Sequence, residues 1–591
     1  MAAKNRHLGT EATAPEQPLE PRDAQALWGS DRVAHLLRAF GIEYLCINPG
    51  SSFRGLHDSV VNFLGNRRPG LIVCLHEEHA VAIAHGYAKV LGRPLGVALH
   101  ANVGLMHATM AIFNAWCDRV PMLVLGGTGP VDAAKRRPFI DWIHTMRDQG
   151  ALVRSYVKWD DQPASIEAAE EALIRAMQIT CTAPTAPVYL NLDSDIQEKP
   201  LDAPGVPQRD LGRFKPVPPP APDEALFEEA LDLLVKARSP AILMGRVSRR
   251  EDDWSERVIL AEKLGSPVAT DLKAGAAFPT AHPLHAGIPG MSLTESAIEA
   301  LRESDVILSL DWVDLAGALS AIWPGQQAPA KVIHVSMDHQ LHNGFSFDHL
   351  ALPPVDLHFA TSADRVTRQL NSRLQRKQQA AELPAPKPIE PPRSDHLTVA
   401  HIAAALERAV GKTPISLLRL PLGWDGSLRQ FGHPLDQLGH SGGGGVGSGP
   451  GMSVGSALAL QNSGRIPVAI LGDGDTLMGI NAIWTAVHYK IPLLILVANN
   501  RSYFNDEVHQ ERIAKRRNRP VQNKWIGQRI SAPDVDIATM AAAQGAVAMG
   551  PITDFDTLQR ATAEAVASVS SGKVALVDVH IGPGYGGTGA S

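Results

Sequence analysis

The pattern of apolar and polar positions is clearest at residues 465–502, where two continuous apolar runs flank a segment with helical periodicity. The first run, residues 467–471, ends abruptly in alternating glycine and aspartate, and residues 476–490 then carry apolar side chains at helical spacing. The second run, residues 491–498, is continuous, as in a strand buried on both faces, and is followed by asparagines. This pattern predicts a right-handed β-α-β unit, whose parallel strands bring both polar loops to one sheet edge.

The two polar loops of this unit carry oxygen ligands suited to a divalent cation. Asp473 follows the first strand and Asn500 follows the second. Gly472 and Gly474 allow a ligand to approach the backbone, and the helix that follows offers free N–H groups to phosphate oxygens. Mg²⁺ prefers few protein oxygens, with substrate phosphates and water completing an octahedron. The spacing also fits an Asp-capped turn followed by an Asn turn, so a second half of the site is needed to decide.

The first 195 residues repeat the alternation of apolar runs and helical patterns. Four short apolar runs end in polar loops, and they lie at residues 44–47, 71–75, 95–99 and 120–126. This alternation predicts a doubly wound parallel sheet with its polar loops gathered at one edge. The loops after the first three runs contain Ser51, Glu77 and His100, which we expect to lie near one another.

Proline-rich stretches divide the chain into units. Residues 1–23 lack the apolar core of a signal peptide and are typical of a disordered leader. Polar linkers rich in proline at 217–222 and 375–395 then separate three segments, each long enough to bury its own core. The fold class expected is α/β, with three doubly wound parallel-sheet domains. Their predicted bounds are 24–195, 222–374 and 396–591.

Composition and charge exclude two classes of partner. The 591 residues are 45% hydrophobic and 20% charged, which is ordinary for a soluble globular protein. The net charge of −6, from 55 basic and 61 acidic residues, leaves no basic surplus for nucleic acid. No apolar run approaches the ~20 residues that span a bilayer. We therefore expect no nucleic-acid or membrane partner.

Cysteines and histidines could serve as metal ligands, and cysteines could form disulfides. The four cysteines lie far apart, three of them within or beside apolar runs, which favours buried free thiols in a cytoplasmic protein. Six histidines between residues 57 and 107 suggest a zinc or iron site. Beyond Glu77 and Glu78, however, no cysteine or carboxylate completes a recognisable ligand set, so no such metal is expected.

The Gly-Asp-Gly loop followed by paired asparagines resembles the cofactor motif of thiamine diphosphate (ThDP) enzymes. Residues 76–89, HEEHAVAIAHGYAK, are similar to another segment of that family, in which a glutamate contacts the aminopyrimidine ring. The resemblance implies Mg²⁺ ligands at Asp473, Asn500 and the main-chain oxygen of Ser502. It also implies that Glu77 hydrogen-bonds the ring and helps the cofactor to lose its thiazolium C2 proton. The alternative for Glu77 is a favourable interaction with the helix dipole alone.

The glycine-rich segment at 441–449 resembles the family's GTMGFG segment, whose backbone wraps the thiazolium. The resemblance implies cofactor contacts from Gly445, Val446 and Gly447, with Val446 as the apolar wedge that bends the cofactor. A flexible surface loop is the alternative. The family likeness implies further cofactor contacts at Gly472, Gly474, Asp475 and Asn500. Asp475 departs from the family's small residue, and a carboxylate beside a diphosphate is unfavourable unless it turns away or is paired.

Two segments are similar to parts of the benzoylformate decarboxylases within this family. They are NPGSS at 48–52 and LHANVGLMHATMAIFNAW at 99–116. The resemblance implies that Ser51 contacts a substrate carboxylate and that His100 moves protons at the reacting carbonyl, for which an ordinary pKa near 6.5 is suited. A histidine hydrogen-bonded at a strand end is the alternative for His100. For His107, further along the helix, the core is the expected place, and a position facing the site is the alternative.

The central segment resembles the family's central domain but lacks two functional segments. Acetolactate synthases carry an arginine-bearing flavin segment where this chain has ILSLDWVDLAG, so FAD is not expected, although other segments also hold flavin. The second catalytic histidine of benzoylformate decarboxylases is also missing there, and Asp311 and Trp312 stand in its place. We expect Trp312 to serve in packing.

These resemblances imply a ThDP- and Mg²⁺-dependent enzyme that cleaves or forms a C–C bond next to a carbonyl of a small molecule. The leading hypothesis is a 2-oxo acid decarboxylase, acyloin lyase or carboligase. One alternative is a C–C hydrolase of a cyclic 1,2-dione, which has a stretch like residues 500–510. Another is a non-catalytic ThDP-fold subunit, although intact Glu77 and Asp473 argue against it. In this family the two half-sites meet across a dimer interface, so a homodimer or homotetramer is implied.

Overall fold

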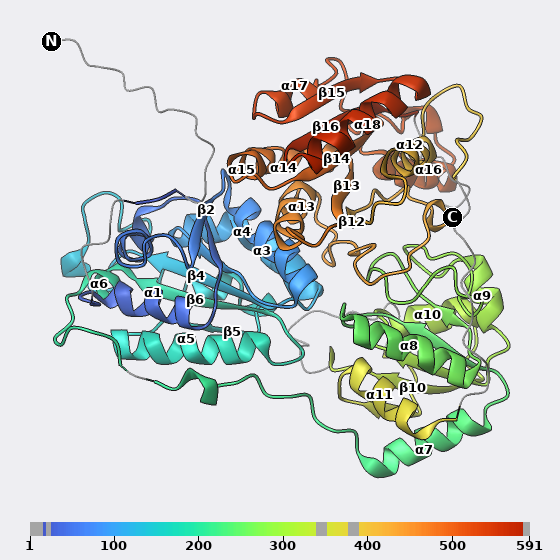
Figure 1. The fold of residues 1–591 in the computed structure, drawn as a ribbon, viewed down its shortest axis with the longest axis horizontal. Coiled ribbons are helices and arrows are strands. Elements are labelled where there is room, and N and C mark those ends of the chain that lie inside the picture. Colours follow the sequence, from blue (N-terminus) through green and yellow to red (C-terminus); the bar gives the residue numbers. More distant parts are fainter. Residues whose placement is uncertain (1–15, 19–24, 208, 339–351, 376–388, 583–591) are drawn as a thin grey trace.

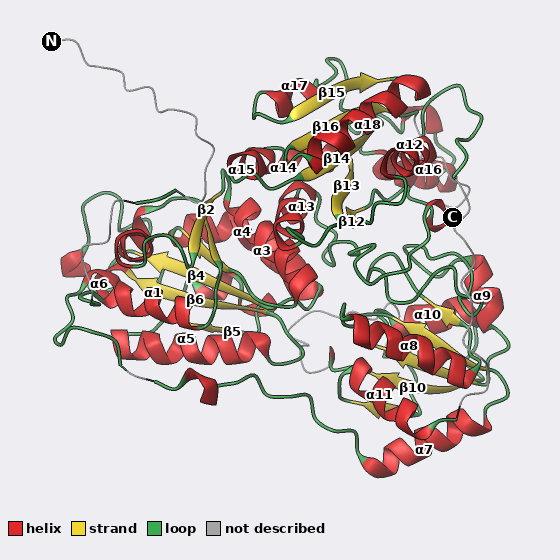
Figure 2. Cartoon of the chain, in the orientation of Figure 1, coloured by secondary structure: helices red, strands yellow, loops and turns green. Residues whose placement is uncertain are grey.

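The structure, a computed structural model, contains three parallel β-sheets with helices around each (Figures 1 and 2). Strand β3 (Gly96–Leu99) shows why both faces of a sheet are covered: Ala98 packs into one apolar core, and Val97 and Leu99 pack into another. The predicted α/β class with three parallel sheets is confirmed. The residues described are 16–18, 25–207, 209–338, 352–375 and 389–582.

The N-terminal sheet has the strand order β2-β1-β3-β4-β6-β5. Its other strands are β1 (Tyr44–Ile47), β2 (Gly70–Val73), β4 (Met122–Thr128), β5 (Trp159–Asp161) and β6 (Pro187–Asp193). The associated helices are α1 (Gly29–Ala39), α2 (Arg54–Asp58), α3 (Glu77–Leu91), α4 (Ala101–Cys117), α5 (Ile166–Cys181) and α6 (Ser194–Glu198). Each of the four apolar runs predicted here forms a strand. Because all strands are parallel, the loops after β1, β2 and β3 emerge at one edge.

The central sheet has the order β11-β10-β9-β7-β8. Its strands are β7 (Pro240–Met244), β8 (Val268–Ala269), β9 (Val306–Leu310), β10 (Lys331–Val335) and β11 (Leu357–Phe359). Its helices are α7 (Glu224–Lys236), α8 (Glu251–Leu264), α9 (Glu295–Leu301), α10 (Leu315–Ile322) and α11 (Ala363–Arg373). Trp312 is buried in an apolar cluster beside α10, so its predicted packing role is confirmed.

The C-terminal sheet has the order β12-β13-β14-β16-β15. Its strands are β12 (Ile415–Arg419), β13 (Ile466–Gly472), β14 (Leu493–Asn499), β15 (Val547–Ile552) and β16 (Val574–His580). Its helices are α12 (Val399–Val410), α13 (Ser448–Ala459), α14 (Asp473–Gly479), α15 (Ala482–His488), α16 (Phe504–Arg516), α17 (Ile537–Ala542) and α18 (Phe555–Ser570). The predicted β-α-β unit is confirmed, because β13 and β14 pair in parallel with Gly472 opposite Ala498.

The connection inside this unit differs from the prediction. The single helix expected at 476–490 is two helices, α14 and α15, and the first begins at Asp473. Gly479, at the end of α14, packs so closely on the backbone of Gly447 that a side chain there would collide with the Gly447 carbonyl oxygen. This tertiary contact lies at the break between the two helices, and apolar periodicity cannot reveal it.

Helices α3 and α13 join the N-terminal and C-terminal domains within one chain (Figure 1). They approach so closely that a Cβ on Gly455 would collide with the carbonyl oxygen of Ile83. The start of α3, which carries Glu77, and the start of α13, which follows the glycine-rich segment, are therefore held in a fixed relation.

The cysteines, the absence of long apolar segments and the proline-rich stretches can also be compared with the sequence predictions. The cysteines are free thiols, of which Cys46, Cys74 and Cys117 are buried and Cys181 is half-buried. Among the described residues no helix is both long and apolar enough to cross a membrane. Most of the leader expected at 1–23, and the middle of the linker expected at 375–395, lie outside the described residues.

Candidate functional site

The three residues predicted to bind Mg²⁺ lie on two neighbouring loops that hydrogen bonds link. Asp473 begins α14 directly after β13 and is buried. Its Oδ1 accepts a hydrogen bond from the backbone N–H of Gly474 at 2.9 Å, and its Oδ2 accepts one from the N–H of Ser502 at 3.0 Å. The same Ser502 N–H lies 3.0 Å from Oδ1 of Asn500. The two loops of the β-α-β unit therefore bring their oxygens together, as predicted.

Burial makes the charged form of the Asp473 carboxylate unfavourable. Burial raises its pKa from 3.8 to about 6, although backbone N–H groups act in the opposite direction. No arginine or lysine among the described residues forms an ion pair with it. A buried carboxylate in this state is suited to a cation, which would neutralise its charge. The donor set therefore fits Mg²⁺, which favours carboxylate, amide and carbonyl oxygens.

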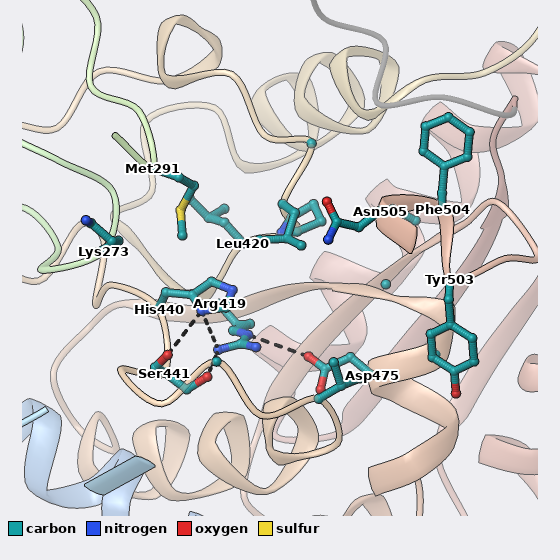
Figure 3. Close-up of a pocket in the computed structure, with 18 of the residues that line it drawn as sticks. Lys273, Met291, Arg419, Leu420, His440, Ser441, Asp475, Tyr503, Phe504 and Asn505 are labelled. Atoms are coloured by element: carbon teal, nitrogen blue, oxygen red, sulfur yellow. Dashed lines mark hydrogen bonds and ion pairs between the residues drawn. The ribbon is translucent and has the colours of Figure 1, made fainter. Parts of the chain in front are cut away.

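Asp475, the departure from the family pattern, is paired inside the protein. Its Oδ1 accepts hydrogen bonds from the backbone N–H groups of Gly447, at 2.7 Å, and Gly449, at 3.2 Å. Its Oδ2 lies 3.5 Å from Nε of Arg419, which is itself buried (Figure 3). Arg419 also donates to Oγ of Ser441 at 2.6 Å. This pairing removes the objection to a carboxylate beside a diphosphate, and it ties the glycine-rich segment to α14.

The glycine-rich segment is docked on helix α4. A Cβ on Gly445 would lie 2.7 Å from Cε of Met110 on that helix, so a side chain at Gly445 would displace the segment. Gly447 has a φ of 105°, a conformation that favours glycine. Val446 between them is 45% exposed, which leaves its side chain free to contact a ligand. Of the two interpretations of this segment, the structure favours the ordered one.

A cavity of about 510 Å³ lies between the glycine-rich segment, the β13 and β14 loops and the central domain (Figure 3). The predicted residues on its wall are Val446, Gly472, Asp473, Gly474, Asp475, Asn500 and Ser502. Sequence reasoning missed several other wall residues, namely Lys273, Met291, Arg419, His440, Tyr503 and Phe504. Gly445 and Gly447 belong to the segment but are not among the lining residues, and neither are Ser51, Glu77 and His100.

Glu77 is the first residue of α3 and is buried beside α4. Its Oε2 lies 3.0 Å from Nδ1 of His107. The expectation that His107 belongs to the core is wrong, because half of its side chain is exposed and its ring stacks on His76 at 5.0 Å. Ligand atoms of His76, Glu77 and His107 lie within 4.8 Å of one another. These three residues could hold a metal ion, and the expectation that no zinc or iron binds here stays a prediction.

His100 is held in one tautomer by the loop after β1. Its Nδ1 lies 3.3 Å from the backbone nitrogen of Ser52 and 2.9 Å from Ser52 Oγ. Because a backbone N–H can only donate, Nδ1 accepts, and the neutral ring carries its proton on Nε2. Burial lowers the pKa of His100, and the neighbouring ring of His144 lowers it further. At neutral pH, His100 therefore presents a neutral N–H group rather than an imidazolium ion.

The segment after β4 brings further groups to the same edge of the sheet. The ring of His144 is perpendicular to that of His100, with 4.7 Å between ring centroids. Nη2 of Arg137 donates to Oγ of Ser51 at 3.3 Å. Sequence reasoning missed both residues, because they lie in an irregular segment with no family motif. The only available signal was their position after a strand whose carboxyl end reaches this edge.

The carboxyl edge of the central sheet, where the flavin segment was sought, carries an ion-pair network. Nη2 of Arg246 lies 3.4 Å from Oδ1 of Asp311 and also contacts Asp338. Nε of Arg119 lies 2.7 Å from Oδ1 of Asp338. Arginines thus reach this edge from other segments, and their charges are engaged with carboxylates. The absence of FAD stays a prediction.

Comparison with known proteins identifies the family. The models of the thiamine pyrophosphate enzyme family match at residues 27–152 (N-terminal TPP binding domain), 227–345 (central domain) and 423–579 (C-terminal TPP binding domain). Benzoylformate decarboxylase of Pseudomonas aeruginosa is 27% identical over 481 residues, covering 79% of this chain and 85% of that protein. The acetolactate synthase isozyme 1 large subunit of Escherichia coli is 25% identical over 494 residues, covering 82% and 83%.

A solved structure shows the same fold. The thiamine diphosphate-dependent 4-hydroxybenzoylformate decarboxylase of Rhodococcus jostii superposes with a TM-score of 0.75 at 22% sequence identity, covering 94% of this chain and 100% of that one. The three family models together span most of the sequence, in the order in which the three sheets occur. The chain therefore belongs to the family of thiamine pyrophosphate enzymes.

Proposed function

We propose that this protein is a ThDP- and Mg²⁺-dependent enzyme that cleaves or forms a C–C bond next to a carbonyl group, as a 2-oxo acid decarboxylase, acyloin lyase or carboligase. The observation that carries the proposal is that both half-sites occur in this one chain. Asp473 is buried without an ion-pair partner in one of them, and Glu77 is buried at a helix start in the other. The relatives, decarboxylases and acetolactate synthases, support the same reaction class.

Each half-site has groups suited to one part of the cofactor. Asp473, Asn500 and the carbonyl oxygen of Ser502 would hold Mg²⁺ and, through it, the diphosphate. Val446 and the glycine-rich backbone would support the thiazolium, and Glu77 would hydrogen-bond the aminopyrimidine. When bound, ThDP supplies a nucleophilic carbon and an electron sink. The protein's own contribution is to orient these parts and to keep the site free of competing water.

His100 is suited to proton transfer on the substrate side. Its Nε2–H is available because Nδ1 is engaged by Ser52. Its lowered pKa keeps it neutral near pH 7, so it can donate the Nε2 proton through a hydrogen bond without carrying a fixed charge. Ser51 in the same loop would contact the substrate.

We further propose that the complete site forms between two copies of the chain. Glu77 is not on the wall of the cavity that contains Asp473, which supports a second copy as the source of the Glu77 that contacts the same cofactor. Exposed apolar side chains lie beside both half-sites, as expected for surfaces covered in a dimer. They are Leu75, Met106, Met110, Val446 and Met478, with exposures between 37% and 56%.

Complementation tests both parts of this proposal. The wild-type protein, loaded with ThDP and Mg²⁺, is first assayed with pyruvate, benzoylformate, acetoin, benzoin and cyclohexane-1,2-dione. The variants Glu77→Gln and Asp473→Ala, each expected to be inactive alone, are then dissociated, mixed and reassembled. Each mixed dimer has one intact site, so about a quarter of wild-type activity should return after random exchange. No recovery would contradict the shared site. Turnover of the cyclic dione alone would favour the hydrolase, and ThDP binding without any turnover would favour a non-catalytic subunit.

A further inference from the structure

We propose that Arg137, together with Ser51, is the receptor for a carboxylate on the substrate, so that the enzyme selects 2-oxo acids over neutral carbonyl compounds. This inference rests on the proposed function and names its substrate class. The central observation is that a partly exposed arginine is held in place by a buried carboxylate. Its guanidinium lies against the serine of the loop that also fixes His100.

Asp141 holds the Arg137 guanidinium in one orientation. Nη2 of Arg137 donates to Oδ1 of Asp141 at 2.9 Å, and Nε lies 3.3 Å from both carboxylate oxygens. The backbone N–H of Arg137 also donates to Oδ2 at 2.7 Å. The Asp141 side chain is only 4% exposed, whereas that of Arg137 is 43% exposed. The cation is therefore oriented from the protein side and open on the other side, as in a preorganised anion site.

Ser51 extends this site towards the reacting groups. Its Oγ accepts a hydrogen bond from Nη2 of Arg137, which leaves the hydroxyl hydrogen free to be donated onwards. Nη1 of Arg137 makes no hydrogen bond within the described part of the chain. A carboxylate could thus receive one hydrogen bond from the serine hydroxyl and one from Nη1. This pair of donors matches the two oxygens of a carboxylate.

The surroundings favour an anion next to a reacting carbonyl. Arg54 also contacts this loop: its Nη1 donates to the Ser51 carbonyl oxygen at 3.2 Å, and its Nη2 is paired with Glu198 at 2.8 Å. The adjacent Ser52 contacts His100, the proposed proton donor. The carboxylates nearby are engaged: Asp141 with Arg137, Glu198 with Arg54, and Glu77 with His107. A 2-oxo acid has its carboxylate bonded to the reacting carbonyl carbon, so these neighbouring groups could contact both parts of it at once.

The test compares charged and neutral substrates that deliver the same acyl group. Pyruvate is paired with acetoin, and benzoylformate with benzoin, in kinetics of the ThDP- and Mg²⁺-loaded enzyme. Arg137→Met should raise KM for the 2-oxo acid about 10- to 100-fold, the value of a charge-assisted hydrogen bond, and leave kcat/KM for the acyloin within about threefold. Arg137→Lys keeps the positive charge but loses the planar pair of donors, so its KM for the 2-oxo acid should lie between those of the wild type and Arg137→Met. Lys135→Met removes a nearby charge that is paired with Asp195, and it should change the kinetics with neither substrate.

Binding without turnover provides a second readout. Calorimetry with methyl benzoylphosphonate, whose anionic phosphonate replaces the carboxylate, should show the same loss of affinity in Arg137→Met. Equal effects on acid and acyloin, or no effect on either, would overturn the carboxylate receptor. Wild-type turnover of acyloins without any 2-oxo acid would also overturn it. C2-proton exchange of bound ThDP separates failure of the Arg137 proposal from failure of the proposed function. If the wild type shows no exchange, ThDP activation itself is refuted. If exchange is normal and Arg137→Met leaves KM for the 2-oxo acid unchanged, only the role of Arg137 is refuted.

Discussion

Asp473→Asn should stabilise the metal-free protein while abolishing its response to Mg²⁺ and ThDP. Burial raises the pKa of Asp473 from 3.8 to about 6. Holding this carboxylate ionised at pH 7 therefore costs roughly 3 kcal/mol relative to the unfolded chain. Asparagine removes that cost but accepts through one oxygen only, so it loses one of two backbone hydrogen bonds, worth about 1 kcal/mol. The net expectation is a gain of about 2 kcal/mol in the free energy of unfolding.

The sign of the pH dependence follows from the direction of this shift. The folded pKa of Asp473 lies above the unfolded value, so its ionisation opposes folding. The cost is present in full above about pH 6 and disappears as the pH falls towards 3.8. Between pH 7 and pH 5 the stability advantage of Asp473→Asn over the wild type should fall by about 1.5 kcal/mol.

Thermal unfolding in EDTA, at pH 7 and pH 5, measures this advantage directly. For a domain of the size of the C-terminal one, a gain of about 2 kcal/mol in the free energy of unfolding corresponds to an increase in Tm of roughly 4–8 °C. Adding Mg²⁺ and ThDP should raise the Tm of the wild type and not that of the variant. Asp475→Asn is the matched control on the same helix, and it should lower the Tm because it leaves Arg419 without its buried partner. A lower Tm for Asp473→Asn in EDTA at both pH values would refute the reasoning.

Three further predictions concern the packing of α3 on α13, the flavin content and the contact between His107 and Glu77. Gly455→Ala should destabilise the α3–α13 contact by roughly 3 kcal/mol, seen as a lower Tm, since its Cβ would collide with the carbonyl oxygen of Ile83; an unchanged Tm would contradict this packing. The purified protein should lack a stoichiometric yellow chromophore, and a flavin spectrum would show that FAD binds through other segments. His107→Phe removes the hydrogen bond to Glu77 and should weaken ThDP binding in calorimetry, whereas His107→Asn should retain more affinity.

The parallel-sheet fold could be predicted because its signals are local. The runs at 467–471 and 491–498 lie within strands β13 and β14, since a strand buried on both faces needs a continuous apolar stretch. The break between α14 and α15 could not be predicted. The break coincides with the contact of Gly479 with the backbone of Gly447, which joins segments that are not neighbours in the sequence.

The candidate site was predictable where it follows motifs and unpredictable where it depends on tertiary pairing. Asp473 and Asn500 were placed together by their strand-end positions. The pairing of Asp475 with Arg419 was not foreseen, because Arg419 ends another strand. His107 was expected in the core, but the apolar side chains of Met106 and Met110 on the same helix are themselves exposed.

C2-proton exchange of bound ThDP tests most directly whether Glu77 activates the cofactor. The ThDP- and Mg²⁺-loaded protein is placed in D₂O, quenched at short times and analysed by NMR. Glu77→Gln should slow the exchange by about 10²–10⁴-fold, whereas His100→Ala should leave it near the wild-type rate and lower only turnover. Exchange at the wild-type rate in Glu77→Gln would contradict the assignment of Glu77 as the residue that activates ThDP.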